Sequence, residues 1–178
     1  MRINRDACSG YSLVELMVAL AIGSFLLAGI GMSYTAIKGT VITSQQLSHA
    51  QEVVRYINYI MSRSVKQTSV IPTITENGTI ITIEQDSYSP SCHGSVPTFS
   101  YQEVYTLSNG YLTCEILNLE DGGNSIGVLN LLKGVQALGF SSSQSGRLIN
   151  INVTPQDVPA QFATGIVISL ATTRVIMR

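Results

Sequence analysis

The sequence predicts an α+β protein in which one long N-terminal helix packs against a C-terminal antiparallel β-sheet. No proline occurs between Ser12 and Pro72, so one uninterrupted helix can run from about Ser12 to about Lys66. Beyond Pro72, short segments of alternating apolar and polar residues are separated by Asn-Gly pairs and other turn residues. This second pattern is typical of antiparallel strands joined by tight turns.

The two halves of the expected helix differ in their apolar patterning. From residue 11 to residue 37 the only ionisable groups are Glu15 and two tyrosines, and about 20 apolar residues suffice to cross a bilayer. We therefore expect residues 11–37 to span a membrane. In residues 38–66, apolar side chains recur at spacings of three and four, so one face of this half should pack against the rest of the chain.

Residues 67–178 are expected to form a β-rich head. Two hairpins are predicted, one around Asn77-Gly78 and one around Asn109-Gly110, because these pairs favour turns that need a positive φ. The segment from Ile126 to Lys133 fits either a short helix or a strand. Later strands are expected at residues 134–140, 148–153 and 166–170, where apolar side chains predominate.

The order of basic, small and apolar residues at the N-terminus is typical of a membrane protein whose head is exported. Arg2 and Arg5 precede the apolar run, and the next cation is Lys38, so the positive-inside rule keeps the first residues in the cytoplasm. In an ordinary secretory signal the small residues follow the apolar run. Here Ser9-Gly10 precedes it, and cleavage at that point would leave the apolar helix on the mature protein.

These N-terminal residues resemble the class III leader of type IV pilins and pseudopilins. The resemblance rests on a short basic leader of residues 1–10, Gly10 at its end, the aromatic Tyr11 next, and Glu15 four residues later. It implies a pilin fold, cleavage after Gly10 by a prepilin peptidase, and N-methylation of Tyr11. It also implies a protein anchored once in the bacterial inner membrane, with a cytoplasmic leader and a periplasmic head, that later joins a pilus on the cell surface.

Glu15 lies inside the apolar run, where a carboxylate at the bilayer centre costs about 2.5 to 3.5 kcal/mol on insertion scales. The resemblance implies a partner for it: the positive N-terminal amine of a neighbouring subunit, at that subunit's Tyr11. Two alternatives remain open. Glu15 could lie near the membrane edge and reach interfacial water, or it could bond the amine of its own chain one turn away.

A second resemblance concerns residues 131–140, Leu-Leu-Lys-Gly-Val-Gln-Ala-Leu-Gly-Phe, followed by an apolar strand before Arg174. They are similar to the corresponding part of PilW-type minor pilins and of J-type pseudopilins. The resemblance implies a structural minor pilin that helps to initiate pilus assembly near the tip, with other minor pilins, the major pilin and the inner-membrane assembly platform as partners. The alternatives are a J-type pseudopilin of a type II secretion system and an adhesive or DNA-binding minor pilin.

Cys8 falls in the leader, so the exported part keeps Cys92 and Cys114. In an oxidising compartment these two are expected to form a disulfide that closes a loop of about 20 residues, a constraint of roughly 3 kcal/mol. Two free thiols, or a metal site with His93, are the alternatives. The spacing does not favour metal, and we expect none.

No enzymatic motif, cofactor motif or nucleic-acid surface is predicted. The chain lacks a nucleophile elbow, a zinc-protease helix motif, a P-loop and dinucleotide-binding glycines, so we expect no enzyme and no cofactor. Charged residues make up only 12% of the sequence and the net charge is −1, which leaves no basic surface for nucleic acid. His49 and His93 are interpreted as surface residues. Two N-glycosylation patterns, at Asn77 and Asn152, are assigned to a turn and a strand.

Overall fold

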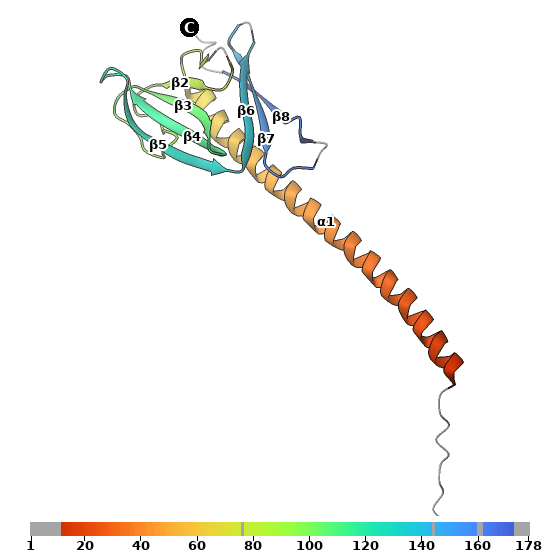
Figure 1. The fold of residues 1–178 in the computed structure, drawn as a ribbon. Coiled ribbons are helices and arrows are strands. Elements are labelled where there is room, and N and C mark those ends of the chain that lie inside the picture. Colours follow the sequence, from red (N-terminus) through yellow and green to blue (C-terminus); the bar gives the residue numbers. More distant parts are fainter. Residues whose placement is uncertain (1–11, 76, 144, 160–161, 173–178) are drawn as a thin grey trace, which may run out of the picture. The chain divides into compact units, whose positions relative to one another are not determined.

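The computed structural model describes residues 12–75, 77–143, 145–159 and 162–172. The chain divides into two compact units, residues 1–44 and residues 45–178. The first contains the N-terminal part of one long helix. The second contains the remainder of that helix together with the eight strands found among its described residues, which form the head (Figure 1). An α+β fold with one long N-terminal helix and antiparallel sheets is thus confirmed, whereas the domain boundaries at residues 10, 37 and 66 remain predictions.

Helix α1 runs without interruption from Leu13 to Gln67, as the absence of proline predicted. Ser12 lies at its N-terminal cap, where its carbonyl accepts the backbone N–H of Leu16 at 3.2 Å. The helix ends where Thr68 turns the chain, because its hydroxyl bonds the carbonyl of Val70 at 2.9 Å and its Oγ1 accepts the N–H of Val70 at 3.1 Å. Pro72 then prevents any continuation of the helix.

The head contains two antiparallel sheets, where the sequence had suggested one. The first has the strand order β1-β2-β3-β4-β5 and the second the order β6-β7-β8. Both expected hairpins are present, as β1 paired with β2 and β3 paired with β4. The strands are β1 Thr73–Ile74, β2 Ile81–Gln85, β3 Tyr101–Ser108, β4 Tyr111–Asn118, β5 Asn124–Lys133, β6 Val135–Ser142, β7 Leu148–Pro155 and β8 Ile166–Ala171.

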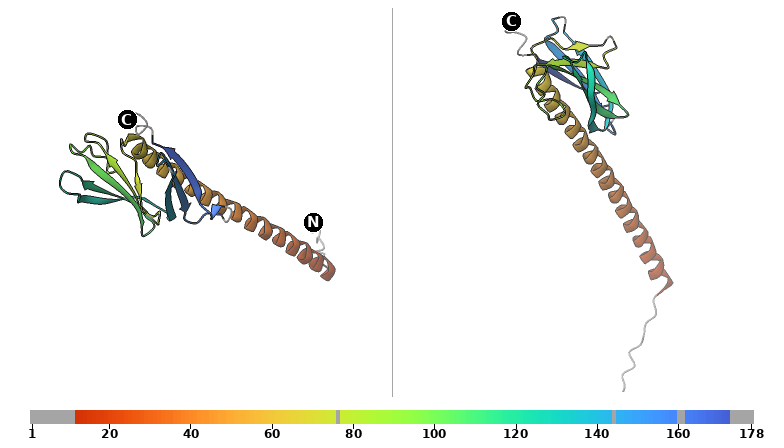
Figure 2. Two further views of the ribbon diagram at one scale, coloured as in Figure 1. Left: turned by 90° about the horizontal axis from the view of Figure 1, so that it is seen from above. Right: turned by 90° about the vertical axis from the view of Figure 1, so that its left-hand side faces the viewer.

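The C-terminal part of α1 lies beside the strands of the head (Figure 2), and one hydrophobic core joins it to both sheets. The helix contributes a stripe at spacings of three and four that includes Val53, Ile57 and Met61. The strands contribute alternate residues, because successive side chains of a strand point to opposite faces. Other core residues are Ile60, Val65, Ile81, Ile83, Tyr101, Tyr105, Leu112, Ile116, Val135, Leu138, Phe140, Ile149, Ile151, Val153 and Leu170.

The chain passes from the first sheet to the second at Gly134, between β5 and β6. Gly134 has a φ of +95°, a conformation that glycine tolerates and other residues rarely adopt. A Cβ added to it would lie 2.6 Å from the ring of His49 on α1. His49 is exposed to solvent, and its ring packs against this junction. Residues 131–140, on which the second resemblance rests, include the crossing between the two sheets.

Candidate functional site

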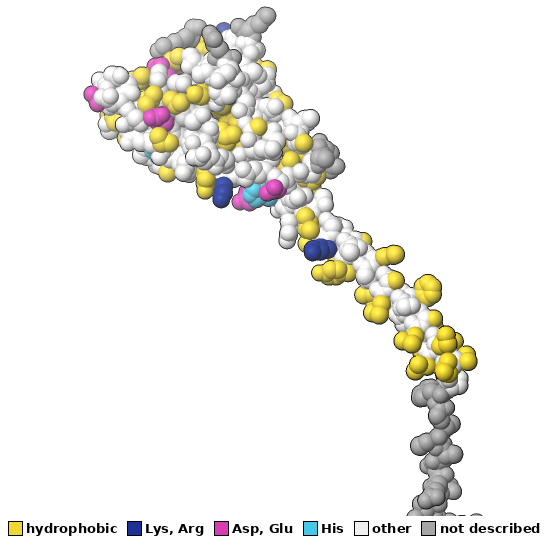
Figure 3. All heavy atoms as spheres, in the orientation of Figure 1, with side chains coloured by type: hydrophobic (Ala, Val, Ile, Leu, Met, Phe, Trp, Pro, Cys, Tyr) yellow, Lys and Arg dark blue, Asp and Glu magenta, His cyan; other side chains and the backbone are white. Residues whose placement is uncertain are grey.

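The apolar segment of α1 exposes its side chains on every side. The helix contains a stretch of mean hydropathy 2.3 in which none of the residues is buried, long and apolar enough to cross a membrane. Leu13 and Phe25 are 75% and 81% exposed. Hydrophobic side chains line this part of the helix in the space-filling view (Figure 3). Such a surface needs lipid or other apolar helices around it.

The serine and threonine hydroxyls of this segment are satisfied by the helix itself. From Ser24 to Thr43, each serine and threonine donates to a carbonyl three or four residues earlier, at 2.8 to 3.1 Å. This arrangement leaves none of these serine and threonine hydroxyls unsatisfied in hydrocarbon, where an unsatisfied polar group is expensive. The polar residues of the segment are therefore compatible with a membrane.

Glu15 is different, because its carboxylate makes no hydrogen bond or ion pair with any residue that the structure describes. Its backbone N–H is satisfied by Ser12, 3.0 Å from the carbonyl oxygen and 3.4 Å from Oγ. Gly10 and Tyr11, the expected cleavage and methylation sites, lie outside the described residues. Within the described chain, Glu15 is thus an acidic group in an apolar segment with its charge uncompensated.

Ser12 is a site residue that the sequence analysis did not identify. It precedes α1 directly, and Glu15 stands three residues later, so the pair has the Ser-x-x-Glu spacing of a helix N-terminal cap. This spacing was visible in the sequence. Its consequence is that the helix begins immediately after the expected cleavage point, with Glu15 in its first turn.

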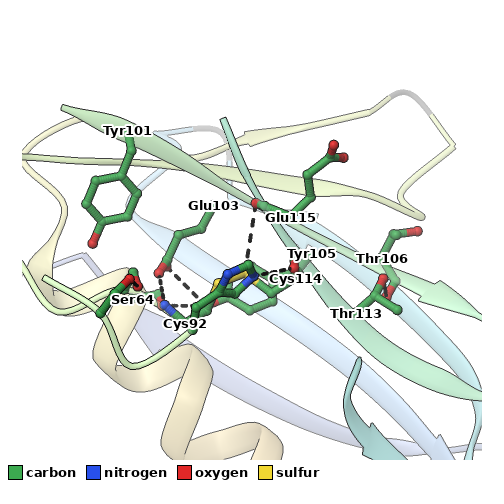
Figure 4. The surroundings of a disulfide bond; sticks show 12 residues. Ser64, Cys92, Tyr101, Glu103, Tyr105, Thr106, Thr113, Cys114 and Glu115 are labelled. Carbon is green, nitrogen blue, oxygen red and sulfur yellow. Dashed lines mark hydrogen bonds between the residues drawn. A yellow bond between two sulfur atoms is a disulfide. The ribbon is translucent and has the colours of Figure 1, made fainter. Parts of the chain in front are cut away.

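In the head, a disulfide joins Cys92, in the loop between β2 and β3, to Cys114 on β4, at a sequence separation of 22. Cys92 and Cys114 are both buried (Figure 4). The loop is also tied to α1, because Arg63 donates from Nη2 to the carbonyl of Ser91 at 2.8 Å. The disulfide therefore fixes a segment that closes over the inner face of the first sheet.

A buried hydrogen-bond network links this loop to α1 through β3. Glu103 accepts the backbone N–H of Cys92 on one carboxylate oxygen and the hydroxyl of Tyr105 on the other, at 2.5 and 3.0 Å. Tyr105 is in turn 2.7 Å from the hydroxyl of Ser64 on α1. Since Tyr105 donates its one proton to Glu103, Ser64 must donate to Tyr105. Figure 4 shows these side chains facing one another.

Burial raises the pKa of Tyr105 well above its ordinary value, and the negative charge of Glu103 raises it further. The pKa of Tyr101, also on β3, is raised for the same two reasons in the same order. Both phenols therefore remain neutral where an exposed tyrosine would begin to ionise. Neutral Tyr105 is what the network requires, because only the protonated hydroxyl can donate to Glu103.

His93 is more deeply placed than the sequence analysis suggested. It is half-buried, and its Nε2 donates to the carbonyl of Cys114 at 3.0 Å. Donor atoms of Cys92, His93 and Cys114 lie within 4.8 Å of one another, a spacing that could hold a metal ion. The two sulfur atoms are bonded to each other, however. In this state the cluster is a disulfide with a packed imidazole beside it.

Comparison with known proteins yields a family match at the N-terminus. Residues 5–31 match the family model for the prokaryotic N-terminal methylation motif. No curated protein matched the chain. Together with the apolar α1 and the antiparallel head, the motif supports a pilin-like protein, that is, a type IV pilin or pseudopilin, whose family has structural and generally non-enzymatic members. The segment and motif are consistent with a single inner-membrane anchor and with processing by a prepilin peptidase.

Proposed function

We propose that this chain is a structural minor pilin of a type IV pilus. It would be inserted in the inner membrane, cut after Gly10, methylated at Tyr11 and then assembled into the filament with other subunits. The observation that carries this proposal is the methylation motif leading directly into an apolar segment in which Glu15 has no partner among the described residues.

Charge compensation gives Glu15 a role in this proposal. A lone carboxylate is unfavourable by about 2.5 to 3.5 kcal/mol at the bilayer centre and by less nearer the surface, and the amine of a neighbouring subunit's Tyr11 would remove the penalty that Glu15 incurs at its depth. The attraction is strong because the surroundings have a low dielectric constant. Methylation of the amine keeps its positive charge, so the modified terminus remains a suitable partner.

The head would supply the contacts that determine which subunits assemble together. By its resemblance to PilW-type proteins, the chain would join other minor pilins in a complex that initiates assembly near the tip, above the major pilin. The assembly platform and the prepilin peptidase would act on its membrane segment. The disulfide and the Glu103 network support this role because they give the head a fixed surface.

The test compares two carboxylates on the same helix. Glu15→Ala should insert and be cleaved normally but be lost from filaments sheared off the cell, because the neighbour's amine no longer has a partner. Glu52→Ala is the control, since Glu52 is an exposed residue of α1 in the head unit. Quantitative immunoblotting of membranes and filaments measures both variants. Equal incorporation of Glu15→Ala and the unaltered chain would contradict the proposal.

A J-type pseudopilin is the second candidate, because the methylation motif and the apolar segment serve pilins and pseudopilins alike. The full chain, solubilised in detergent, should co-purify with other minor pilins if the first candidate is right. Co-purification with the pseudopilins of a type II secretion system would favour the second.

A further inference from the structure

The head carries two Asn-X-Thr patterns, whose asparagines are both exposed but which the structure places in different backbone settings, a turn and a paired strand. Asn77-Gly78-Thr79 occupies the exposed turn between β1 and β2, whereas Asn152-Val153-Thr154 lies within β7, the central strand of the second sheet. An Asn-X-Thr pattern is the acceptor for N-linked glycosylation. The sequence alone does not distinguish the two patterns, but their structural surroundings differ.

In the turn, the side chain of Asn77 is held by its carbonyl oxygen. Its Oδ1 accepts the hydroxyl of Thr79 at 2.9 Å, the hydroxyl of Thr75 at 2.8 Å and the backbone N–H of Thr79 at 3.3 Å. The amide nitrogen of Asn77 makes no hydrogen bond with the described residues. The nucleophilic nitrogen is therefore available on an exposed residue, while the oxygen fixes its orientation.

The middle residue of this pattern must be glycine for a structural reason. Gly78 has a φ of +67°, and a Cβ on it would lie 2.7 Å from the carbonyl oxygen of Phe140 on β6. The N–H of Phe140 also donates to the carbonyl of Gly78 at 2.7 Å. The turn is thus anchored to the second sheet, and it presents Asn77 in a fixed position.

Asn152 does not lie in a turn, and its side chain is not held by the threonine of its pattern. Its strand is paired on both sides, with Gly139 of β6 and Val167 of β8. Thr154 is only 8% exposed and makes no hydrogen bond with Asn152. A Cβ on Gly165 would lie 2.3 Å from Oδ1 of Asn152, so backbone packs directly against that amide. The side chain of Asn152 is exposed, but its backbone is paired on both sides. This pattern could therefore bend into the active site of an enzyme only if β7 left the sheet.

A groove of about 500 Å³ with both polar and apolar walls is lined by Asn77 and, further along, by Asn152. Its lining includes Ser141 on β6 and Asn150 on β7. The hydroxyl and amide groups of these residues can exchange hydrogen bonds with a sugar, whose own hydroxyls both donate and accept. A first sugar on Asn77 would therefore find a complementary surface on the head.

We infer that Asn77 is an N-linked glycosylation site of the folded head and that Asn152 is not. The donor would be an oligosaccharide carried on a lipid pyrophosphate, transferred by a membrane oligosaccharyltransferase. Nδ2 of Asn77 forms a bond to C1 of the first sugar, and the bond from C1 to the pyrophosphate oxygen breaks. The proton leaves to a base of the enzyme and the lipid pyrophosphate departs, so no oxidant or reductant is required.

The experiment uses the full chain isolated from the membranes of the cells that produce it. Intact mass and glycopeptide mass spectrometry should show one oligosaccharide on Asn77. The added mass should disappear in Asn77→Gln and Thr79→Val, and should persist in Asn152→Gln and in Thr79→Ser, which keeps the hydroxyl. Thermal unfolding of each variant verifies that the head is folded. An unmodified Asn77, or an oligosaccharide on Asn152, would overturn the inference.

Discussion

Tyr105 donates its hydroxyl proton to Glu103 at 3.0 Å in the interior of the head, where neither side chain is exposed to solvent. The same carboxylate accepts the backbone N–H of Cys92, so one buried group connects β3 to the disulfide loop. A buried carboxylate is tolerated only when hydrogen bonds compensate for its lost hydration. Glu103 is therefore expected to be a structural residue on which the folding of the head depends.

Replacing Glu103 by alanine should lower the free energy of unfolding by about 1 to 3 kcal/mol, because two buried donors lose their acceptor. Glu103→Gln should be milder, since one amide oxygen can still accept the N–H of Cys92. Urea denaturation of the detergent-solubilised chain measures both. Glu115→Ala, on the neighbouring strand, is the control. If Glu103→Ala and Glu115→Ala have equal effects, Glu103 does not have this role.

The raised pKa values of Tyr101 and Tyr105 predict a loss of stability at alkaline pH. In the unfolded chain a tyrosine ionises near pH 10, whereas in the head these two stay protonated. Above that pH the unfolded state binds fewer protons than the folded state, so stability falls as pH rises. The slope is about 1.4 kcal/mol per pH unit for each tyrosine. Below pH 10 this contribution is fully present.

Tyr105→Phe should reduce the steepness of that alkaline decline, because one of the two groups no longer ionises on unfolding. The measurement is the free energy of unfolding as a function of pH from about 9 to about 11.5, on either side of the ordinary tyrosine pKa, by urea titration at each pH. The variant has a lower stability at neutral pH because Glu103 loses a donor, so the slopes are compared and not the absolute values. An unchanged slope would exclude Tyr105 as a contributor.

The disulfide should stabilise the head by roughly 3 kcal/mol, the chain-entropy value for a loop of this length. The double variant Cys92→Ser, Cys114→Ser should therefore unfold at a lower urea concentration, and a reductant should have little further effect on it. Cys8→Ser should leave stability unchanged, because Cys8 lies in the expected leader and outside the head. A double variant as stable as the oxidised chain would show that the cross-link is dispensable.

Gly134→Ala should be more destabilising than Gly94→Ala. Both glycines have a positive φ, +95° and +79°, which disfavours alanine by about 1 to 2 kcal/mol. A Cβ at Gly134 would also clash with the ring of His49, whereas nothing lies within 4 Å of a Cβ at Gly94. His49→Ala should remove the additional penalty and leave the backbone strain. If Gly134→Ala and Gly94→Ala lower the free energy of unfolding equally, with or without His49→Ala, a clash with His49 is excluded.

Much of the fold could be predicted, because its signals are local. The absence of proline indicated the whole of α1, and Asn-Gly pairs indicated both hairpins. The segment around β5 stayed ambiguous for a physical reason. It is an exposed edge strand whose pairing with β4 has two register shifts, so its side chains do not alternate regularly. The division into two sheets depends on the backbone at Gly134, which periodicity does not reveal.

The candidate site was only partly accessible from the sequence. Glu15 is recognisable because a charge in an apolar run is conspicuous, and the two exported cysteines could be counted. Glu103 was missed, although it alternates with Tyr101 and Tyr105 on the buried face of β3. Tyr105 is only two residues away, but the other groups of the network, Cys92 and Ser64, come from the β2–β3 loop and from α1, and such contacts leave no local pattern. His93 was taken for a surface residue for the same reason.

The most direct test of the account is the mass of the N-terminal peptide of the chain recovered from cell membranes. If the protein is a pilin-like subunit, that peptide begins at Tyr11 and carries one methyl group on its amine, and Gly10→Ala or loss of the prepilin peptidase restores the longer form. A chain that keeps residues 1–10 in cells with an active peptidase would contradict the assignment.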